Sequence, residues 1–164
     1  MHGGGVADYK QGNESTVAEL GNGDLMLNMR NMDTAKNLRM SAISSDGGES
    51  FAPATETTLI EPINNGCQGS LLRYSINSQG AANLLFANPN HGSSRRNGTI
   101  KLSTNDGKNW TRTFMYVPEN TYTSYSDLVA LPDARVGVLY ERGRNNDEGI
   151  HFRSVRFDEI VQSL

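Results

Sequence analysis

A tyrosine, a glutamate and two arginines are the side chains of this 164-residue sequence with the clearest chemical potential. Tyr125 stands in the segment 123–128, Glu14 lies near the start, and Arg30 and Arg95 lie between them. A phenol has an ordinary pKa near 10, so it acts as a nucleophile only when a base takes its proton during the attack. A guanidinium fork matches a carboxylate in two hydrogen bonds. Taken alone, Tyr125 is more readily a half-buried strand residue and Arg30 a surface residue at a strand end, so the surrounding segments must decide whether these side chains act together.

Metal and phosphate chemistry have no comparable support in the sequence. His2, His91 and His151 are widely separated without ligand spacing, and the single Cys67 is too little for a cysteine-based metal site. The glycine run 3–5 lacks the strand–turn–helix setting of a phosphate loop and is interpreted as a flexible linker. We therefore expect neither a metal nor another cofactor.

The elements that must position these side chains are predicted to be β-strands. Seventeen glycines, with many Asn, Ser and Thr, separate short apolar runs throughout the chain, which is typical of an all-β protein. Hairpin turns are expected at 21–24 and 131–135, and a short helix at 157–164. The strands are predicted at 16–20, 24–29, 39–44, 70–76, 83–88, 99–103, 127–131, 136–141 and 150–157.

The charge and composition of the chain give no indication of binding to nucleic acid or to a membrane. A net charge of −3 with 20% charged residues gives no basic field for nucleic acid and no polybasic membrane patch. No stretch approaches the roughly 20 apolar residues of a membrane span, and the first residues lack the regions of a signal peptide.

An internal repeat gives the fold. The segments 44–51 (SSDGGESF) and 103–110 (STNDGKNW) share the pattern Ser-x-Asp/Asn-x-Gly-x-x-aromatic and begin 59 positions apart. The Asp or Asn side chain can bond nearby backbone N–H groups, Gly allows a positive φ, and the aromatic ring can fill the space between sheets. The pattern resembles the Asp-box of β-propellers.

The spacing of the repeat predicts the number of blades. A four-stranded blade takes about 40 to 50 residues, so 59 fits one blade with a longer loop. The chain is then long enough for about three blades, whereas propellers close with roughly 4 to 8. We therefore expect an all-β fold that forms half of a six-bladed propeller, with two unpaired sheet faces or edges that favour association.

Four further segments resemble the second half of the exo-α-sialidase family of bacterial type, and together they span nearly the whole chain. Their order and spacing, with the two Asp-boxes between them, carry the resemblance. It implies that residues 1–164 are the C-terminal part of a sialidase catalytic propeller whose N-terminal blades are absent. The segments are 13–20 (NESTVAEL) continuing to 28–30 (NMR), 66–70 (GCQGS), 95–99 (RRNGT), and 125–128 (YSDL) followed by 139–141 (LYE).

The resemblance implies a role for the tyrosine and the glutamate. Tyr125 matches the nucleophile of the family, and sialidases are the tyrosine exception among glycosidases that otherwise use two carboxylates. Glu14 occupies the position of the base that takes the phenol proton. Glu19 is the competing candidate, and the family pattern favours Glu14, which leaves Glu19 as a structural strand residue.

The resemblance also implies a substrate-binding set. Arg30 matches the second of three arginines that hold the substrate carboxylate. Arg95 and Arg96 both compete for the third position, and adjacent residues of an extended chain point to opposite sides, so only one reaches the site. The family form Arg-x-Asn-x-Thr favours Arg95. Glu141 matches a carboxylate that orients the first arginine.

The segment 66–70 has a less definite role. Gln68 and Ser70 are expected to line the sugar pocket or shape its floor, and a plain tight turn is an equal alternative. The first arginine, the acid/base aspartate and a loop that contacts the N-acyl group have no counterpart in this sequence, so we expect the isolated chain to be deficient in catalysis.

Three functions follow as alternatives. The first is an exo-α-sialidase that releases terminal sialic acids from sialylated glycans with retention through a tyrosyl intermediate. The second is a non-catalytic module that binds sialoglycans, and the third is an inactive truncated fragment. Association with the missing propeller half, or self-association, is the expected protein contact, and the family implies a secreted or periplasmic location.

Overall fold

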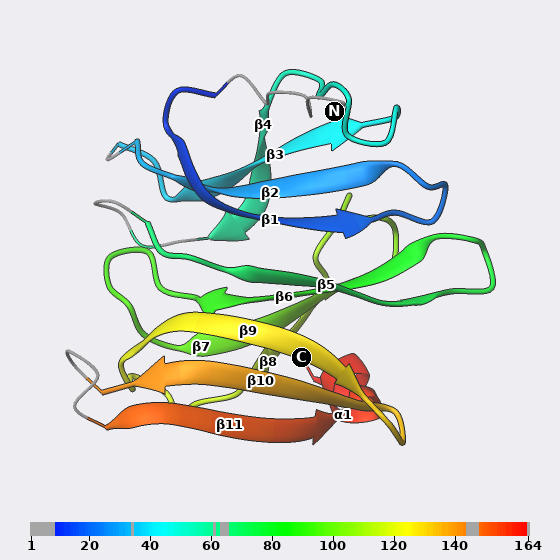
Figure 1. Ribbon diagram of the computed structural model, residues 1–164. Helices are drawn as coiled ribbons and strands as arrows, with labels where there is room; N and C mark the ends of the chain where they lie inside the picture. Colours follow the sequence, from blue (N-terminus) through cyan, green and yellow to red (C-terminus); the bar gives the residue numbers. More distant parts are fainter. Residues whose placement is uncertain (1–8, 34, 61, 63–65, 144–147, 164) are drawn as a thin grey trace.

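The structure is a computed structural model that describes residues 9–33, 35–60, 62, 66–143 and 148–163 (Figure 1). His2 and the glycine run 3–5 lie outside these residues. Eleven strands and one short helix are present in the described part. The strands are β1 (Gly12–Glu19), β2 (Leu25–Asn31), β3 (Leu38–Ser44), β4 (Thr55–Ile60), β5 (Ser70–Ile76), β6 (Ala82–Pro89), β7 (Gly98–Ser103), β8 (Arg112–Met115), β9 (Thr123–Leu131), β10 (Arg135–Arg142) and β11 (Gly149–Arg156), and the helix is α1 (Phe157–Gln162).

The strands form three antiparallel sheets that follow one another along the chain. Their orders are β1-β2-β3-β4, β5-β6-β7-β8 and β11-β10-β9, so within each sheet every strand pairs with the next one in the chain. The sheets lie side by side as three blades, with β5 in contact with β1 on one side and with β9 on the other (Figure 1). The predictions of an all-β fold and of about three blades are confirmed.

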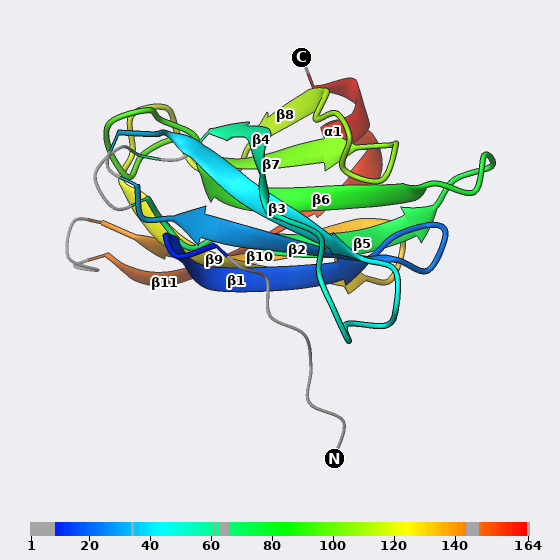
Figure 2. The ribbon, with the colours of Figure 1, turned by 90° about the horizontal axis from the view of Figure 1, so that it is seen from above.

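Two strands, β4 and β8, were not predicted from the sequence. Each is the fourth strand of its sheet, and most of its residues are at least partly exposed, so neither carries an apolar run that would mark it. Figure 2 shows β4, β8 and α1 on the side of the molecule opposite β1. Two other strands begin earlier than predicted, so that β1 includes Glu14 and β9 includes Tyr125.

The two Asp-box turns have the hydrogen bonds that their sequences predict. In the first, the Asp46 carboxylate accepts hydrogen bonds from the Ser44 hydroxyl at 2.7 Å and from the Ser50 backbone N–H at 2.9 Å. In the second, Asn105 Oδ1 accepts equivalent bonds from Ser103 at 3.0 Å and from the backbone N–H of Asn109 at 2.9 Å. The predicted role of these boxes as structural turns is confirmed.

Apolar side chains fill the spaces between the blades. One cluster joins the first and second blades and includes Leu59, Leu84 and Phe86, with Trp110 of the second Asp-box packed against it. The other joins the second and third blades and includes buried Ile160 of α1. Burial of these side chains is the main force that holds the blades together, at about 25 cal/mol per Å² of apolar surface.

The outer face of the third blade is exposed and apolar. Val129, Leu139, Ile150 and Phe152 retain 45–63% of their accessible surface. Leu139 pairs with Phe152 across β10 and β11, while the neighbouring Val138 is buried against the second blade. Alternation along the strands therefore gives this sheet two apolar faces, of which one is covered.

The described residues contain neither a membrane-spanning helix nor a cluster of metal ligands. That part of the chain contains no helix with the length and apolar character needed to cross a bilayer. Within the same residues, no group of three or more His, Cys, Asp and Glu side chains is placed to hold a metal ion.

Candidate active site

Glu14 and Arg30 face one another at a β-bulge. Gly12 pairs with Asn31 and Ser15 pairs with Met29, so two residues of β1, Asn13 and Glu14, oppose the single Arg30 of β2. A bulge of this kind turns a side chain out of the regular alternation of the strand. The result is an ion pair in which Arg30 Nη1 donates to Glu14 Oε2 at 2.6 Å.

Tyr125 stands at a second bulge, in the third blade. Tyr140 pairs with Ser126 and Arg142 pairs with Thr123, so Ser124 and Tyr125 of β9 together oppose Glu141 of β10. The Glu141 carboxylate accepts a hydrogen bond from the backbone N–H of Tyr125 at 3.1 Å. Glu141 therefore fixes the main chain at the point where the phenol leaves the strand.

The two bulges bring the first and third blades into contact at one point. The Tyr125 hydroxyl donates a hydrogen bond to Glu14 Oε1. Arg30 Nη1 lies 3.5 Å from the same hydroxyl oxygen and bonds the other oxygen of the carboxylate. Phenol, carboxylate and guanidinium form one connected group, while 37% of the surface of Tyr125 stays exposed.

Arg95 reaches the same group from the second blade. It lies in the loop between β6 and β7, and its carbonyl accepts a hydrogen bond from the backbone N–H of Thr123 at 3.1 Å. Its Nη1 donates to the Ser124 hydroxyl at 2.9 Å, and its Cζ lies 5.7 Å from the centre of the Tyr125 ring. Each of the three blades thus contributes to the site.

Arg96 and Glu19, the alternatives to Arg95 and Glu14, lie outside this group of side chains. Arg96 is exposed and forms an isolated β-bridge with Tyr122. Glu19 is at the other end of β1 from Glu14 and pairs with Arg73 at 3.1 Å, with half of its side chain exposed.

The shared hydrogen bond shifts both pKa values in opposite directions. The bond to Glu14 is the largest cause that raises the pKa of Tyr125, with burial next. Burial alone would raise the pKa of Glu14, but the hydrogen bonds from Tyr125 and Arg30 outweigh it and lower the pKa. Near neutral pH the pair therefore holds a protonated phenol and an ionised carboxylate, which is the state in which the carboxylate can accept the phenol proton.

Gln68 and Ser70 both bond to β9, at residues that follow Tyr125. Gln68 is one of the residues around a cavity of about 250 Å³ beside Tyr125, whereas Ser70 is not. The Ser70 hydroxyl donates to Asp127 Oδ1 at 3.0 Å. The cavity is lined by Gln68, Tyr125, Ser126, Asp127, Leu139, Tyr140, Glu141 and Ile150.

Sequence reasoning did not single out Ser124. Its hydroxyl accepts the hydrogen bond from Arg95, lies 3.9 Å from the Cys67 sulfur, and is buried. Its position next to Tyr125 was the one feature of the sequence that could have indicated a role in the site, because serine is a common strand residue with no distinctive motif around it here.

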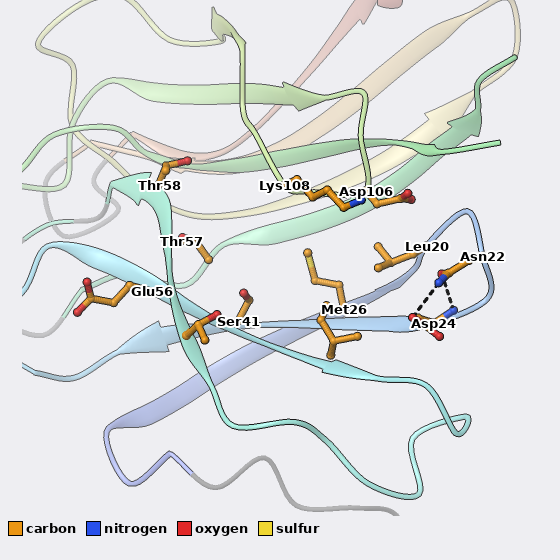
Figure 3. A pocket seen from close by; sticks show the side chains of 13 residues that line it. Leu20, Asn22, Asp24, Met26, Ser41, Glu56, Thr57, Thr58, Asp106 and Lys108 are labelled. Atoms are coloured by element: carbon orange, nitrogen blue, oxygen red, sulfur yellow. Dashed lines mark hydrogen bonds between the residues drawn. The ribbon is translucent and has the colours of Figure 1, made fainter. Parts of the chain in front are cut away.

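A larger hollow of about 420 Å³ lies away from this site, between β4, the β1–β2 turn and the second Asp-box (Figure 3). Asn22 and Asp24 line it from the turn, and Asp106 and Lys108 from the box. The turn is at the opposite end of β1 and β2 from Glu14 and Arg30. The hollow is therefore a separate feature of the blade periphery.

The three blades with their Asp-box turns make this chain a partial β-propeller, with a tyrosine–carboxylate pair and two arginines gathered where the blades meet. The BNR repeat-like domain family matches residues 3–138, and the chain belongs to this family.

Two sialidases of bacteria and one solved sialidase structure are similar to this chain. The sialidase of Micromonospora viridifaciens is 39% identical over 136 residues, which are 79% of this chain and 20% of that protein. The sialidase of Bacteroides fragilis is 31% identical over 91% of this chain and 27% of its own length. The solved structure of a Hadza microbial sialidase superposes with a TM-score of 0.73 at 32% identity, over 92% of this chain and 28% of that chain. The chain spans about a fifth to a quarter of the curated relatives.

Proposed function

We propose that this chain supplies one side of the active site of an exo-α-sialidase, with Tyr125 as the nucleophile and Glu14 as its base. The observation that carries the proposal is the hydrogen bond from the Tyr125 hydroxyl to Glu14, which joins the first and third blades. The sialidase relatives support the substrate class.

The substrate explains why the nucleophile is a phenol. The anomeric carbon of sialic acid carries a carboxylate, which repels an approaching aspartate or glutamate, whereas a neutral phenol meets no such repulsion. The raised pKa of Tyr125 means that the free phenolate is scarce at neutral pH. The proton must therefore pass to Glu14 as the new bond forms.

The reaction then runs in two displacements. Tyr125 Oη bonds to the anomeric carbon, its proton moves to Glu14, and the bond to the aglycone oxygen breaks as a separate acid protonates that oxygen. In the second step water attacks the same carbon and gives a proton back to that acid, and the phenolate oxygen leaves with the proton returned by Glu14. Two inversions at one carbon give overall retention.

Arg30 and Arg95 would hold the substrate carboxylate. Their guanidinium groups approach Tyr125 from the first and second blades, at 3.5 Å from its hydroxyl and 5.7 Å from its ring centre. The positive charge of both also lowers the pKa of Glu14, which keeps this base ionised. Glu141, bonded to the backbone of Tyr125, acts as a support of the nucleophile.

The isolated 164 residues are proposed to be incomplete as a catalyst. The departing aglycone oxygen needs a proton, and the resemblance to sialidases assigns its donor to an aspartate with no counterpart among these candidate residues. The chain also spans only 20% and 27% of two sialidase relatives. We therefore expect catalysis from a longer polypeptide that contains these residues.

Hydrolysis of an aryl sialoside, measured as release of its phenol, tests the proposal. A six-bladed protein that contains these residues should hydrolyse the sialoside and should leave its methyl ester intact, because the ester masks the carboxylate that Arg30 and Arg95 bind. Equal hydrolysis of the acid and the ester would contradict the proposal.

A second candidate is a module that binds sialoglycans without cleaving them. It is favoured by the presence of both arginines beside Tyr125, because they can bind a carboxylate without any proton transfer. Calorimetric binding of sialic acid without any turnover, in the longest polypeptide that contains the chain, would support this alternative over the enzyme.

A further inference from the structure

The strand that carries Tyr125 has one edge without a neighbouring strand. β9 is the last strand of its sheet and pairs only with β10. Backbone groups of alternate residues point to the same side of a strand, so those of Ser126 and Leu128 face away from β10 while the N–H of Tyr125 points to Glu141. An unpaired strand edge presents backbone N–H and C=O groups that need other partners.

Two side chains of the segment 66–70 bind this edge. The Gln68 amide pairs with Ser126 in both directions: Nε2 donates to the Ser126 carbonyl at 3.0 Å, and Oε1 accepts from the Ser126 N–H at 2.9 Å. Two residues further on, the Ser70 hydroxyl accepts from the Leu128 N–H at 3.0 Å. The side chains thus take the place of a neighbouring strand.

The segment itself is held firmly. The buried Arg39 donates from Nη1 to the Cys67 carbonyl at 2.7 Å and from Nε to Asn28 Oδ1 at 2.5 Å. A Cβ atom at Gly69 would lie 2.3 Å from the Phe86 ring, so only glycine fits between Gln68 and Ser70. Gln68 and Ser70 therefore lie on a main chain that is fixed by hydrogen bonds and close packing.

We propose that Gln68 and Ser70 are positioning residues for the nucleophile: they clasp the free edge of β9 and thereby set the Tyr125 hydroxyl against Glu14. The importance of this placement for catalysis rests on the proposed function. Neither residue needs to touch the substrate, which separates this role from that of a pocket wall. Misplacement of a reacting group by about 1 Å can cost on the order of a hundredfold in rate.

Hydrogen exchange on the 164-residue chain tests the clasp without any assay of activity. Gln68→Met keeps the length of the side chain and removes both hydrogen bonds, so exchange of the Ser126 amide should become about tenfold faster or more. Ser70→Ala should speed exchange of the Leu128 amide by a smaller factor, because this N–H also donates to Asp127 Oδ1 at 3.0 Å. Gln79→Met is the matched control, since Gln79 is exposed in the β5–β6 turn. Unchanged exchange at Ser126 in Gln68→Met would overturn the proposal.

Gln68→Glu adds a reversible form of the same test. A protonated glutamic acid donates and accepts as the amide does, whereas the carboxylate cannot donate to the Ser126 carbonyl. The ionised form also places a negative oxygen against the Ser126 carbonyl oxygen, and this repulsion should open the contact. Protection of the Ser126 amide, relative to wild type, should therefore be lower at pH 7 than at pH 4. Equal relative protection at both pH values would contradict the clasp, even if Gln68→Met does not fold.

Titration of Tyr125 by NMR distinguishes a role of Gln68 in positioning the Tyr125 hydroxyl from a role in fold stability alone. In Gln68→Met the contact with Glu14 should loosen, and the pKa of Tyr125 should fall toward the ordinary value, while Gln79→Met leaves it unchanged. Loss of protection at Ser126 with an unchanged Tyr125 titration would overturn the positioning role. Neither readout depends on turnover, so failure of the clasp and failure of the sialidase proposal are distinguishable.

Discussion

The hydroxyl of Tyr125 donates a hydrogen bond to Oε1 of Glu14, a residue 111 positions away in the sequence. Each of the two stands at a β-bulge, one in the third blade and one in the first. Bulges redirect side chains from the regular faces of a sheet. Here they turn a phenol and a carboxylate toward each other across the blade junction.

Replacing Glu14 should make Tyr125 easier to ionise. The carboxylate favours the protonated phenol, so the pKa of Tyr125 in Glu14→Gln should fall toward the ordinary value near 10. A tyrosine with a raised pKa stabilises the fold below its ordinary pKa, and this contribution is lost as the pH rises through the raised value. The variant should therefore lose less stability than wild type above about pH 10.

Ultraviolet or NMR titration of the tyrosines measures the shift, with Glu19→Gln as the matched control because Glu19 pairs with Arg73 on the surface. A Tyr125 titration that is the same in wild type and Glu14→Gln would show that the two side chains are not coupled in solution.

The adjacent arginines offer a second matched pair. Arg95→Met should weaken binding of sialic acid by about tenfold to a hundredfold, the usual size of a lost charged hydrogen bond. Arg96→Met should change the affinity less than twofold, because Arg96 is exposed and bridges to Tyr122. Calorimetry on both variants checks this. A larger loss in Arg96→Met than in Arg95→Met would reverse the assignment.

Local sequence patterns were sufficient to predict most of the fold. The turns at 21–24 and 131–135 lie between β1 and β2 and between β9 and β10, and the short helix was predicted where α1 forms. β4 and β8 escaped prediction because their exposed residues show no apolar period. Outer strands of blades are stabilised by backbone pairing to an inner strand, and a single sequence carries little record of such pairing.

The site was accessible from the sequence only through resemblance. No local pattern reports that Asn13 and Glu14 oppose one arginine, since a bulge depends on the register of a partner strand. The same holds for the bonds of Gln68 to Ser126, which join residues 58 positions apart. The roles of Tyr125, Glu14, Arg30 and Arg95 remain predictions that the geometry supports. The role of Glu141 as the orienter of a further arginine remains a prediction that nothing here tests, since its observed bond is to the backbone of Tyr125.

The exposed face of the third blade should drive self-association of the isolated chain. Ile150 and Phe152 are 63% and 58% exposed on one apolar surface. Contiguous apolar patches of this kind favour contact with other chains. Replacing both with serine should lower the sedimentation coefficient at high concentration toward that of a monomer.

Ile76→Ser is the control for this change, because Ile76 is 48% exposed at the end of β5 in the second blade. Self-association that is equal in wild type and the double variant would locate the contact elsewhere on the chain.

The central claim is that Tyr125 is the nucleophile of a sialidase. The most direct test is the turnover of an aryl sialoside by the Tyr125→Phe variant of a six-bladed protein that contains these residues. Tyr74→Phe is the control, because Tyr74 stacks on Phe157 with ring centres 4.2 Å apart, away from the site. We predict that Tyr125→Phe lowers kcat by about a thousandfold or more with the fold intact, while Tyr74→Phe stays within a few-fold of wild type. Turnover by Tyr125→Phe at the wild-type rate would contradict the account.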